Sequence, residues 1–585
     1  MTVEKLITDH IDIWSSALQT RSTAGRGSNG KIDLYGIKKL RELILELAVR
    51  GKLVPQDPND EPASELLKQI AKEREELVKS KAIRKPKALE KIAITNTPFD
   101  LPDGWEWCYL NDIGDWGAGA TPSRSNSKYY NGDIPWFKSG ELSSDFISES
   151  EESITELALQ ECSLRDNKVG DVLIAMYGAT IGKTSILNVR GTTNQAVCAC
   201  TPYSGISNIY LITLLKAYKR VFIGMGAGGA QPNISREKLI ATVFALPPQN
   251  EQKRIIHKVD ELMSLCDQLE QQSLNRLDAH QQLVETLLAT LTDSQNAEVL
   301  AENWARISLH FDTLFTTEVS IDALKQTILQ LAVMGKLVPQ DPNDEPASEL
   351  LKRIEQEKAQ LVKEGKIKKQ KPLPPVSDEE KSFELPDGWE WTTMQGLYPE
   401  FQNGLSSRGS SSGKDSVVIR LADIKNWKVS FADTRAIAIT DSEKQKYCLD
   451  KNDILIVRVN GSADIVGGFV LYDDDQNVCY CDHFIRLRLP YKRVIDENYL
   501  ILVASSPLIR RKINNLFITT AGQKTVNQTH ISSLLFPLPP YKEQKCIVAR
   551  VNELFSLCEQ LKLRLQSAHQ TQLNLADALT DAALN

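Results

Sequence analysis

The chain has 585 residues, of which 42% are hydrophobic and 25% are charged. This length exceeds what one hydrophobic core supports and predicts several domains. The sequence has no uncharged apolar run long enough to span a membrane, and the N-terminal MTVEKLITDHIDIW is too acidic for a signal peptide. The ten cysteines are scattered, which suits reduced thiols, so we expect a cytoplasmic protein. The net charge of −7 excludes a uniformly basic nucleic-acid-binding protein, so such a surface must be local or be assisted by partner subunits.

The first predicted element is a helical region that occurs twice. GKLVPQDPNDEPASELLK at 51–68 recurs unchanged at 335–352, and the similarity extends to LPDGWEW, which begins at Leu101 and again at Leu385. We expect LPDGWEW to form a turn at 102–104, with Trp105 and Trp107 at the edge of a domain. The Pro- and Asp-rich stretch after GKLVP is predicted to be an exposed loop that could dock a partner, and the charged runs 71–91 and 352–371 to be solvated helices or linkers.

Two segments of similar layout but different sequence follow the repeats, from Cys108 to Ala245 and from Thr392 to Pro537. Strands are predicted at matching places, in GDVLIAMY from Gly170, NQAVCACT from Asn194, NDILIVRVN from Asn452 and DHFIRLRL from Asp482. The first segment has 12 basic and 13 acidic residues and the second 18 and 15, so neither is a strongly basic nonspecific binder. A duplicated scaffold should present one partner surface twice, whereas unlike inserts should bind different ligands.

A second repeat closes each segment, FALPPQNEQKRIIHKVDELMSLCDQLE from Phe244 and FPLPPYKEQKCIVARVNELFSLCEQLK from Phe536. Both predict a helix of about 38 residues, roughly 55 Å long. Apolar residues recur at spacings of four and three, as in a coiled-coil seam: Ile255, Val259, Leu262, Cys266 and Leu269 in one, and Ile547, Val551, Leu554, Cys558, Leu561 and Leu565 in the other. Packing on the helix's own domain would explain one such stripe equally well, but two matching stripes favour pairing with each other.

The combined motifs resemble the specificity subunits of Type I restriction-modification systems, and the long N-terminal repeat region resembles their IB branch. The first insert carries ATPSRSNSKYYNGDIPWFKSGEL from Ala120, GDVLIAMYGATIGKTSI from Gly170, TTNQAV from Thr192 and GGAQPNISREKL from Gly228. The second insert departs from it, with AGQKTVNQTHIS from Ala521 in place of the AQPNIS element.

This resemblance implies a non-catalytic DNA-recognition subunit with an α+β fold, in which two target-recognition domains are separated by a pair of long antiparallel helices in a pseudo-twofold repeat. The implied regions are 1–100 and 294–384 (conserved helical regions), 101–249 and 385–541 (recognition domains), and 250–293 and 542–585 (spacer helices). Each recognition domain would bind one half of a bipartite double-stranded DNA site, and the repeats would dock two modification subunits. The family binds S-adenosylmethionine on those partners and ATP and Mg on the restriction subunits, so no cofactor is expected in this chain.

Polar loops rich in Arg, Lys, Asn and Gln supply hydrogen-bond donors and acceptors for base edges and phosphates. The candidate DNA contacts in the first insert are Thr121, Ser123, Arg124, Lys128, Lys138, Lys183, Asn194, Gln195, Gln231 and Asn233. Those in the second are Arg408, Lys414, Arg420, Arg458, Asn460, His483, Gln523, Lys524, Asn527 and Gln528. Each is equally consistent with a solvated surface residue, Tyr129, Tyr130 and Trp136 favour a core role, and a strand position favours a buried His483.

Several enzyme-like motifs fail on spacing. GATIGKT from Gly178 has three residues, not four, between its glycine and the GK pair of a phosphate loop, and Gly224, Gly226 and Gly229 lack a strand–turn–helix context. LPPY from Leu538 has leucine where adenine methyltransferases need a polar residue. Cys448, Cys479, Cys481 and His483 lack the CxxC spacing of a zinc site. The remaining alternative is a duplicated-domain enzyme that uses a nucleotide or S-adenosylmethionine on nucleic acid.

Overall fold

The computed structural model describes residues 3–20, 32–86, 88–92, 97–226, 232–365, 376–406, 413–490, 494–520 and 522–584. The chain divides into two compact units. Over the described ranges just given, unit 1 comprises the residues within Met1–Thr20, Ile32–Leu274 and His569–Asn585, and unit 2 comprises those within Asn275–Ala568. None of the described helices is both long enough and apolar enough to cross a membrane.

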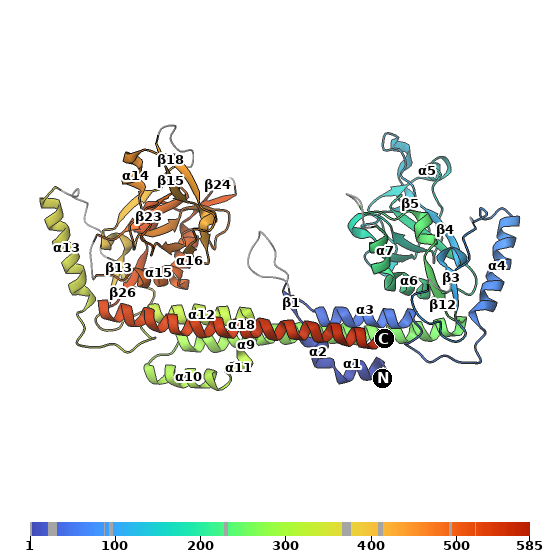
Figure 1. Cartoon of the computed structure of the whole chain (residues 1–585), viewed down its shortest axis with the longest axis horizontal. Coiled ribbons are helices and arrows are strands. Elements are labelled where there is room, and N and C mark those ends of the chain that lie inside the picture. Colours follow the sequence, from blue (N-terminus) through green and yellow to red (C-terminus); the bar gives the residue numbers. More distant parts are fainter. Residues whose placement is uncertain are drawn as a thin grey trace. The chain divides into compact units, whose positions relative to one another are not determined.

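Unit 1 begins with a helical region, continues into a mixed α/β domain and ends in a long helix (Figure 1). Its helices are α1 (Val3–Asp9), α2 (Ile11–Ser16), α3 (Tyr35–Val49), α4 (Ala63–Lys79), α5 (Glu156–Glu161), α6 (Asn208–Ala217), α7 (Lys219–Gly226), α8 (Arg236–Ile240) and α9 (Gln249–Thr292), the last of which continues into unit 2. Its strands are β1 (Gln19–Thr20), β2 (Ile32–Asp33), β3 (Glu106–Tyr109), β4 (Gly114–Ala118), β5 (Tyr130–Phe137), β6 (Phe146–Ile147), β7 (Ser153–Ile154), β8 (Val172–Ala175), β9 (Thr184–Leu187), β10 (Thr192–Thr193), β11 (Val197–Pro202) and β12 (Val243–Leu246).

Unit 2 repeats this order with a larger set of short strands. Its helices are α10 (Ala297–Leu309), α11 (Phe311–Leu314), α12 (Glu318–Val333), α13 (Ala347–Lys363), α14 (Asp441–Tyr447), α15 (Glu497–Ser505), α16 (Pro507–Leu516), α17 (Gln528–Ser532) and α18 (Tyr541–Leu584), the last of which ends in unit 1. Its strands are β13 (Glu390–Thr393), β14 (Glu400–Asn403), β15 (Lys414–Ile419), β16 (Ile424–Lys425), β17 (Lys428–Val429), β18 (Arg435–Ile439), β19 (Ile454–Val457), β20 (Val459–Asn460), β21 (Phe469–Leu471), β22 (Cys479–Tyr480), β23 (Phe484–Arg488), β24 (Ile518–Thr520), β25 (Gln523–Thr525) and β26 (Leu535–Leu538).

The predicted strand runs form the centre of each domain. In unit 1, β8 and β11 pair antiparallel inside the sheet β4-β11-β8-β9-β6, and a second sheet has the order β10-β5-β7. In unit 2, β19 and β23 pair antiparallel inside the sheet β14-β23-β19-β21, beside a sheet of order β18-β15-β22. Strands β8 and β19 are buried at every residue, which fits their continuous apolar sequences. The α+β class is confirmed.

The LPDGWEW motif joins the helical region of each unit to its α/β domain. In unit 1, the buried Trp105 donates from Nε1 to Glu251 Oε2 on α9 (3.0 Å), and Gln56 Nε2 donates to Glu251 Oε1 (3.2 Å). A Cβ at Gly51, where φ is +67°, would lie 2.6 Å from the ring of Pro102, so this close contact requires glycine. The loop after GKLVP is therefore fastened to the start of the long helix.

Unit 2 repeats these contacts with the residues that the duplication predicts. Trp389 Nε1 donates to Glu543 Oε2 on α18 (3.0 Å), and Gln340 Nε2 donates to Glu543 Oε1 (3.1 Å). The loop after GKLVP is largely exposed, as expected, but its Asp344 side chain is only 9% exposed and pairs with Lys542 (3.1 Å). Identical sequence thus builds the same joint twice.

Contacts of the repeated helices give the directions of α9 and α18 inside each unit. In unit 1, Arg41 of α3 pairs with Asp267 of α9 (2.7 Å), and the later residue Gln56 contacts the earlier residue Glu251. This order shows that α3 and α9 are antiparallel. Lys39 pairs with Asp577 of α18 (3.1 Å), and farther along Lys52 Nζ donates to Leu584 O (2.7 Å), so α18 runs parallel to the repeated module. The two long helices therefore run in opposite directions within unit 1.

The same analysis holds inside unit 2. Helix α12 is antiparallel to α18, because Lys325 pairs with Glu559 and Asp322 with Lys562 (3.5 Å). Lys336 Nζ donates to Thr292 O (2.8 Å) at the end of α9, as Lys52 does at the end of α18. A lysine that binds the last carbonyls of a helix offsets the partial negative charge of that helix end.

Most residues of the predicted stripes are buried, with Leu554, Leu561 and Leu565 partly so, and the α18 stripe packs on more than the opposite long helix. Ile547, Val551 and Cys558 of α18 share one apolar cluster with Leu324 and Ile328 of α12, and the cluster also contains residues of α9 and of the α/β domain. In this cluster α9 contributes Val284, Leu288 and Leu291 and not the stripe at 255–269, so the cluster does not show the expected pairing of the two stripes with each other. Each long helix has 44 residues instead of about 38, because the periodic sequence continues past the quoted stripe.

Candidate nucleic-acid interface

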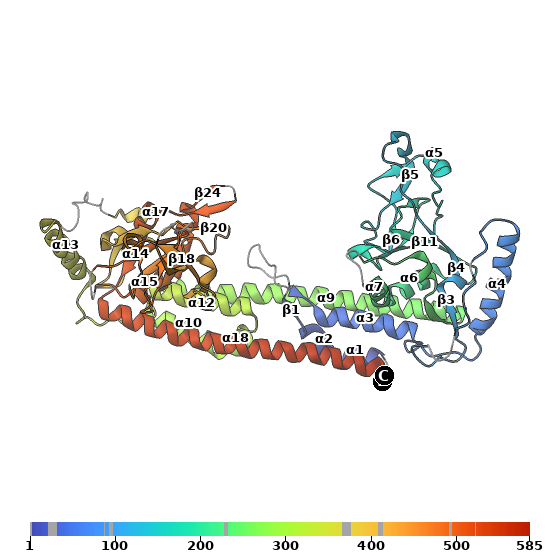
Figure 2. The ribbon, with the colours of Figure 1, turned by 45° about the horizontal axis from the view of Figure 1, so that its top comes forward.

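The loop between β4 and β5 forms one side of a group of polar side chains in unit 1, called the polar corner below, which consists of Thr121, Arg124, Lys138, Asn194 and Gln195. Gly119 N donates to Val197 O (3.0 Å), and a Cβ on Gly119 would lie 2.1 Å from Thr193 O, so only glycine permits this approach. The loop consequently brings Thr121 to Gln195, and the Thr121 hydroxyl donates to the Gln195 side-chain oxygen. Figure 2 shows β5 and α5 at the end of this domain that lies away from α3 and α9.

Asn194 belongs to the same corner. Its backbone N donates to Phe137 O (3.0 Å), and its side-chain Oδ1 accepts from Ala196 N (3.1 Å). Because the oxygen already stabilises the turn, the side-chain NH₂ group is the part of Asn194 that suits a ligand. Asn233 is held beside the corner through its neighbour in the chain. Ile234 N donates to Met176 O (2.9 Å), and Met176 N donates to Ala196 O (2.8 Å).

Arg124 projects from the β4–β5 loop and lies against two aromatic rings. Its guanidinium carbon is 4.7 Å from the ring centre of Tyr130 and 5.2 Å from that of Trp136. Tyr130 Oη donates to Pro122 O (2.6 Å), and Trp136 Nε1 donates to Ala120 O (3.1 Å), which fixes both rings to the loop. The core role expected for Trp136 is confirmed, since it is 2% exposed, and its face also supports Arg124.

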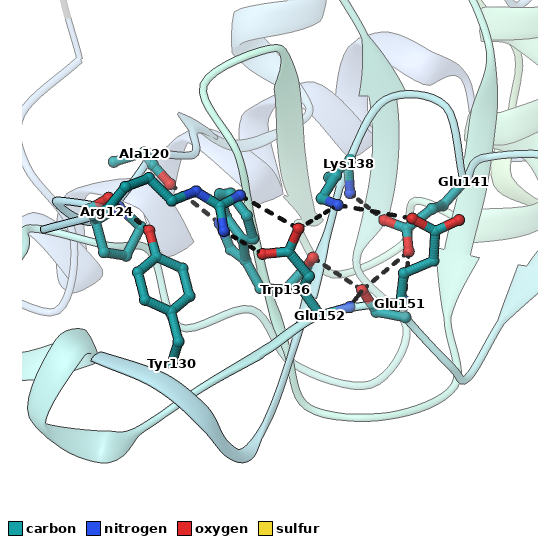
Figure 3. Close-up of polar contacts among 10 residues, drawn as sticks. Ala120, Arg124, Tyr130, Trp136, Lys138, Glu141, Glu151 and Glu152 are labelled. Carbon is teal, nitrogen blue, oxygen red and sulfur yellow. Dashed lines mark hydrogen bonds and ion pairs between the residues drawn. The ribbon is translucent and has the colours of Figure 1, made fainter. Parts of the chain in front are cut away.

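A carboxylate that the sequence analysis did not single out joins Arg124 to Lys138 (Figure 3). Arg124 Nη1 lies 2.5 Å from Glu152 Oε2 and Nη2 lies 3.2 Å from Oε1, and Lys138 Nζ lies 2.5 Å from Oε1. The hydrogen bonds from Arg124 and Lys138 lower the pKa of Glu152 from 4.5 to about 2, so this carboxylate stays ionised at neutral pH. The sequence signal for it was the acidic run ESEES at 149–153, which follows both basic residues in the chain.

The other candidates in unit 1 differ in how strongly they are engaged. Ser123 and Lys128 are exposed, and the half-buried Lys183 donates from Nζ to Gly140 O (3.3 Å). Gln231 lies outside the described residues.

The second domain builds an equivalent corner on a matching frame. A Cβ at Gly404 would lie 2.1 Å from Cys481 O, and Cys481 N donates to Ile419 O (3.0 Å), as Asn194 N donates to Phe137 O in unit 1. Arg420 therefore follows β15 at the position that Lys138 has after β5.

Two candidates of this domain are less suited to DNA than predicted. Arg420 binds Asp423 through Nε (3.1 Å) and Nη2 (2.9 Å), and Nη2 also donates to Asp433 O (2.6 Å), so the guanidinium stabilises its own turn. Lys414 is exposed at the opposite end of β15, paired with Ile439. Arg408 lies outside the described residues.

The other candidates of unit 2 do meet. Strand β20 pairs with β25, so Asn460 faces Lys524, whose Nζ donates to Gly461 O (2.9 Å). Arg458 N donates to His483 O (2.7 Å), and the exposed Gln523 lies in β25.

Helix α17 adds two more of the predicted residues to this corner. Gln528 Nε2 donates to Asn403 Oδ1 (3.0 Å). Asn527 begins α17, where its Oδ1 accepts from His530 N (2.8 Å) as a helix cap.

The expectation of a buried His483 was wrong. Cys481, Asp482 and His483 form a turn before β23, so the strand alternation that would have buried the imidazole is interrupted, and the His483 side chain is 49% exposed. Its Nδ1 lies 3.4 Å from Asp482 Oδ1. Within the described ranges, ligand atoms of these three residues lie within 4.8 Å of one another, and Cys479 is not among them. Cys448 pairs with Cys479 through an isolated main-chain β-bridge, and both thiols are free.

Two α+β domains that carry comparable polar corners with unlike side chains define a duplicated binding protein. The model of the Type I restriction modification DNA specificity domain matches residues 102–279 and 415–567. The Type I restriction enzyme EcoAI specificity subunit of Escherichia coli is 48% identical, and the EcoEI specificity subunit of the same organism is 47% identical, each over 601 aligned residues that cover both chains completely.

Solved structures give weaker likenesses. The HsdS subunit from Thermoanaerobacter tengcongensis has a TM-score of 0.40 and 16% identity, covering 84% of this chain and 99% of that chain. A chain from a study of type I R-M complex assembly has a TM-score of 0.47 and 16% identity, covering 83% of this chain and 99% of its own. Since both scores are below 0.5, the assignment rests on the sequence matches: the chain belongs to the family of Type I restriction-modification specificity subunits, as the motifs predicted.

Proposed function

We propose that the chain recognises a bipartite double-stranded DNA sequence, with one half bound by each α/β domain. The observation that carries this proposal is the polar corner that both units build on the same main-chain frame with different side chains. A shared frame with unlike side chains suits two domains that bind the same kind of ligand and select different sequences. Base edges in the major groove are distinguished by hydrogen-bond donors and acceptors of the kind found at these corners.

In unit 1 the proposed contacts are centred on Thr121, Arg124, Lys138, Asn194 and Gln195. Ser123, Lys128, Lys183 and Asn233 are assigned to the margin of the same contact, whereas Gln231 stays a sequence prediction. The aromatic support of Arg124 holds its guanidinium in one plane, which favours a two-point hydrogen bond to a base edge over a mobile contact to a phosphate.

In unit 2 the proposed contacts are centred on Arg458, Asn460, His483, Gln523 and Lys524. Gln528 and Asn527 are assigned to its margin and Arg420 to support of the turn, whereas Lys414 and Arg408 stay sequence predictions. Because the inserts are nearly balanced in charge, affinity must come from specific contacts together with positive charge on partner subunits.

The duplicated modules are proposed as the docking sites of two modification subunits, which would bring S-adenosylmethionine to the DNA. Restriction subunits would add ATP and Mg to the full complex, and we place the complex in the cytoplasm. The boundaries 1–100, 101–249, 250–293, 294–384, 385–541 and 542–585 are proposed as its functional regions, and the IB branch stays a prediction. Helices of 44 residues are about 66 Å long, which suits a spacer between half-sites one or two turns of B-DNA apart.

The test uses the full chain purified with the modification subunit of its own system. Selection from a pool of randomised duplex DNA should enrich two short sequences at a fixed separation, and methylated adenines should map to the same sequence in cells. Enrichment of no sequence would contradict the proposal. Binding of nucleotide or S-adenosylmethionine by the isolated chain would support the alternative, a duplicated-domain enzyme.

A further inference from the structure

Glu152 is the centre of a cluster in which every member is held in place. Its backbone O accepts from Trp136 N (2.9 Å), which fixes the residue beside β5. Glu141 orders the preceding segment, because its carboxylate accepts from Ser150 Oγ (3.0 Å) and from Glu151 N (2.7 Å). The Glu152 carboxylate therefore approaches Arg124 and Lys138 from a rigid backbone.

Arg124 and Glu152 form a two-point contact, in which Nη1 donates to Oε2 and Nη2 donates to Oε1 (Figure 3). We call this contact the fork. A guanidinium has five N–H donors in one plane, so a fork to a carboxylate fixes the direction of the donors that remain. The rings of Tyr130 and Trp136 lie against the same guanidinium and limit the space in which it can move. Arg124 is nevertheless 57% exposed at its side chain, so it stays accessible to a ligand.

The cluster also changes the charge of the corner. Two cations, Arg124 and Lys138, meet the carboxylate of Glu152, and Glu151 lies 3.6 Å from Lys138 Nζ. Because these carboxylates neutralise much of the positive charge of the two cations, the corner attracts the phosphate backbone only weakly, whatever the base sequence.

Unit 2 has a related arrangement at the equivalent position. The cation that follows β15, Arg420, is paired with Asp423, whose side chain is 2% exposed. Both domains thus pair the cation at this point of the frame with a carboxylate. Among the residues that the structure describes, the link to a second arginine that lies against aromatic rings is found in unit 1.

We propose that Glu152 is a positioning residue that sets the base preference of the first recognition domain. It orients the Arg124 guanidinium toward a base edge and prevents Arg124 and Lys138 from binding phosphates without regard to sequence. This inference rests on the proposed function, since it assumes that unit 1 contacts DNA at this corner.

The experiment compares Glu152→Gln with Glu149→Gln in the complex with the modification subunit. Glu149 is an exposed acid of the same segment, so both variants lose one negative charge and only the first loses the fork. Glu152→Gln should weaken discrimination at one or two adjacent base pairs of a single half-site by about 5- to 150-fold, the range for a two-point hydrogen bond to a base. Its binding to a duplex without the site should become tighter, with a log–log salt slope steeper by about 0.9 for each additional phosphate that the variant neutralises.

A second variant keeps the test decisive if Glu152→Gln fails to fold, which thermal unfolding would reveal. Arg124→Lys retains the charge but cannot form the fork, so it should alter preference at the same base pairs and leave the salt slope unchanged. Wild-type enrichment of two half-sites together with unchanged preference in Glu152→Gln and Arg124→Lys would overturn the inference alone. An equal loss of affinity for every sequence in folded Glu152→Gln would also overturn it, whereas a wild-type complex that selects no sequence would remove the proposed function itself.

Discussion

Replacement of Glu251 by alanine should loosen the joint between the first repeat and its recognition domain. The Glu251 residue is 1% exposed and accepts hydrogen bonds from Trp105 and Gln56. Gln56 Nε2 also donates to Gly51 O (2.7 Å), so the change leaves the buried Trp105 N–H as the group without an acceptor. A buried donor without an acceptor costs about 1–3 kcal/mol, and we expect unit 1 to lose that amount of unfolding free energy.

Glu251→Gln separates the hydrogen bond from the charge. Burial raises the pKa of the Glu251 carboxylate above its usual 4.5, so the ionised form opposes folding at neutral pH. A raised folded-state pKa gives a stabilising contribution that is present below about pH 4.5 and is lost as the pH rises through the folded value. The amide oxygen of glutamine can still accept from Trp105, so Glu251→Gln should match or exceed the wild type at pH 7 and lose that advantage near pH 4.

Hydrogen exchange followed by mass spectrometry is the suitable assay, because a chain with two units need not unfold in one step. Glu251→Ala should raise exchange at 101–109 and 249–256 and leave the equivalent joint at 385–393 protected, whereas Glu543→Ala should do the reverse. Equal protection in Glu251→Ala and wild type would refute the reasoning, as would an equal loss in Glu251→Gln.

Three further changes test other parts of the structure. Arg165 is 19% exposed and binds Asp115 (2.7 Å) and Thr201 (2.9 Å), so Arg165→Ala should cost unit 1 about 2–4 kcal/mol in chemical denaturation, and a cost below 1 kcal/mol would contradict this. Lys336→Met removes the cation at the end of α9 and should cost about 1 kcal/mol, seen as faster exchange in the last turn of that helix, and unchanged exchange there would contradict the capping role. The folded pKa of Glu152 is about 2, below its usual 4.5, so the ionised carboxylate stabilises the fold above about pH 4.5 and this stabilisation is lost as the pH falls. The small difference in melting temperature between wild type and Glu152→Gln should therefore shrink from pH 6 to pH 3, and a difference that grows would contradict this reasoning.

The sequence determined those features that depend on local pattern and on duplication. Continuous apolar runs such as GDVLIAMY predicted buried strands, and β8 and β19 lie there because burial on both faces selects such runs. The identical repeat predicted that Trp105 and Trp389 would have matching environments, and each donates to a glutamate of a long helix. Identical residues in identical local sequence build the same contacts, so a repeat can be interpreted without coordinates.

Contacts between segments far apart in the chain were decided by the tertiary structure. The sequence predicts Arg124 and Lys138 as DNA contacts, but their shared partner Glu152 becomes visible only when β5 and the 150–152 segment pair. Likewise, the turn that exposes His483 depends on how β22 and β23 meet their neighbours, which alternation along one strand does not encode. Sequence specifies which groups are available, whereas three-dimensional pairing decides which of their donors and charges are already satisfied and which remain for a ligand.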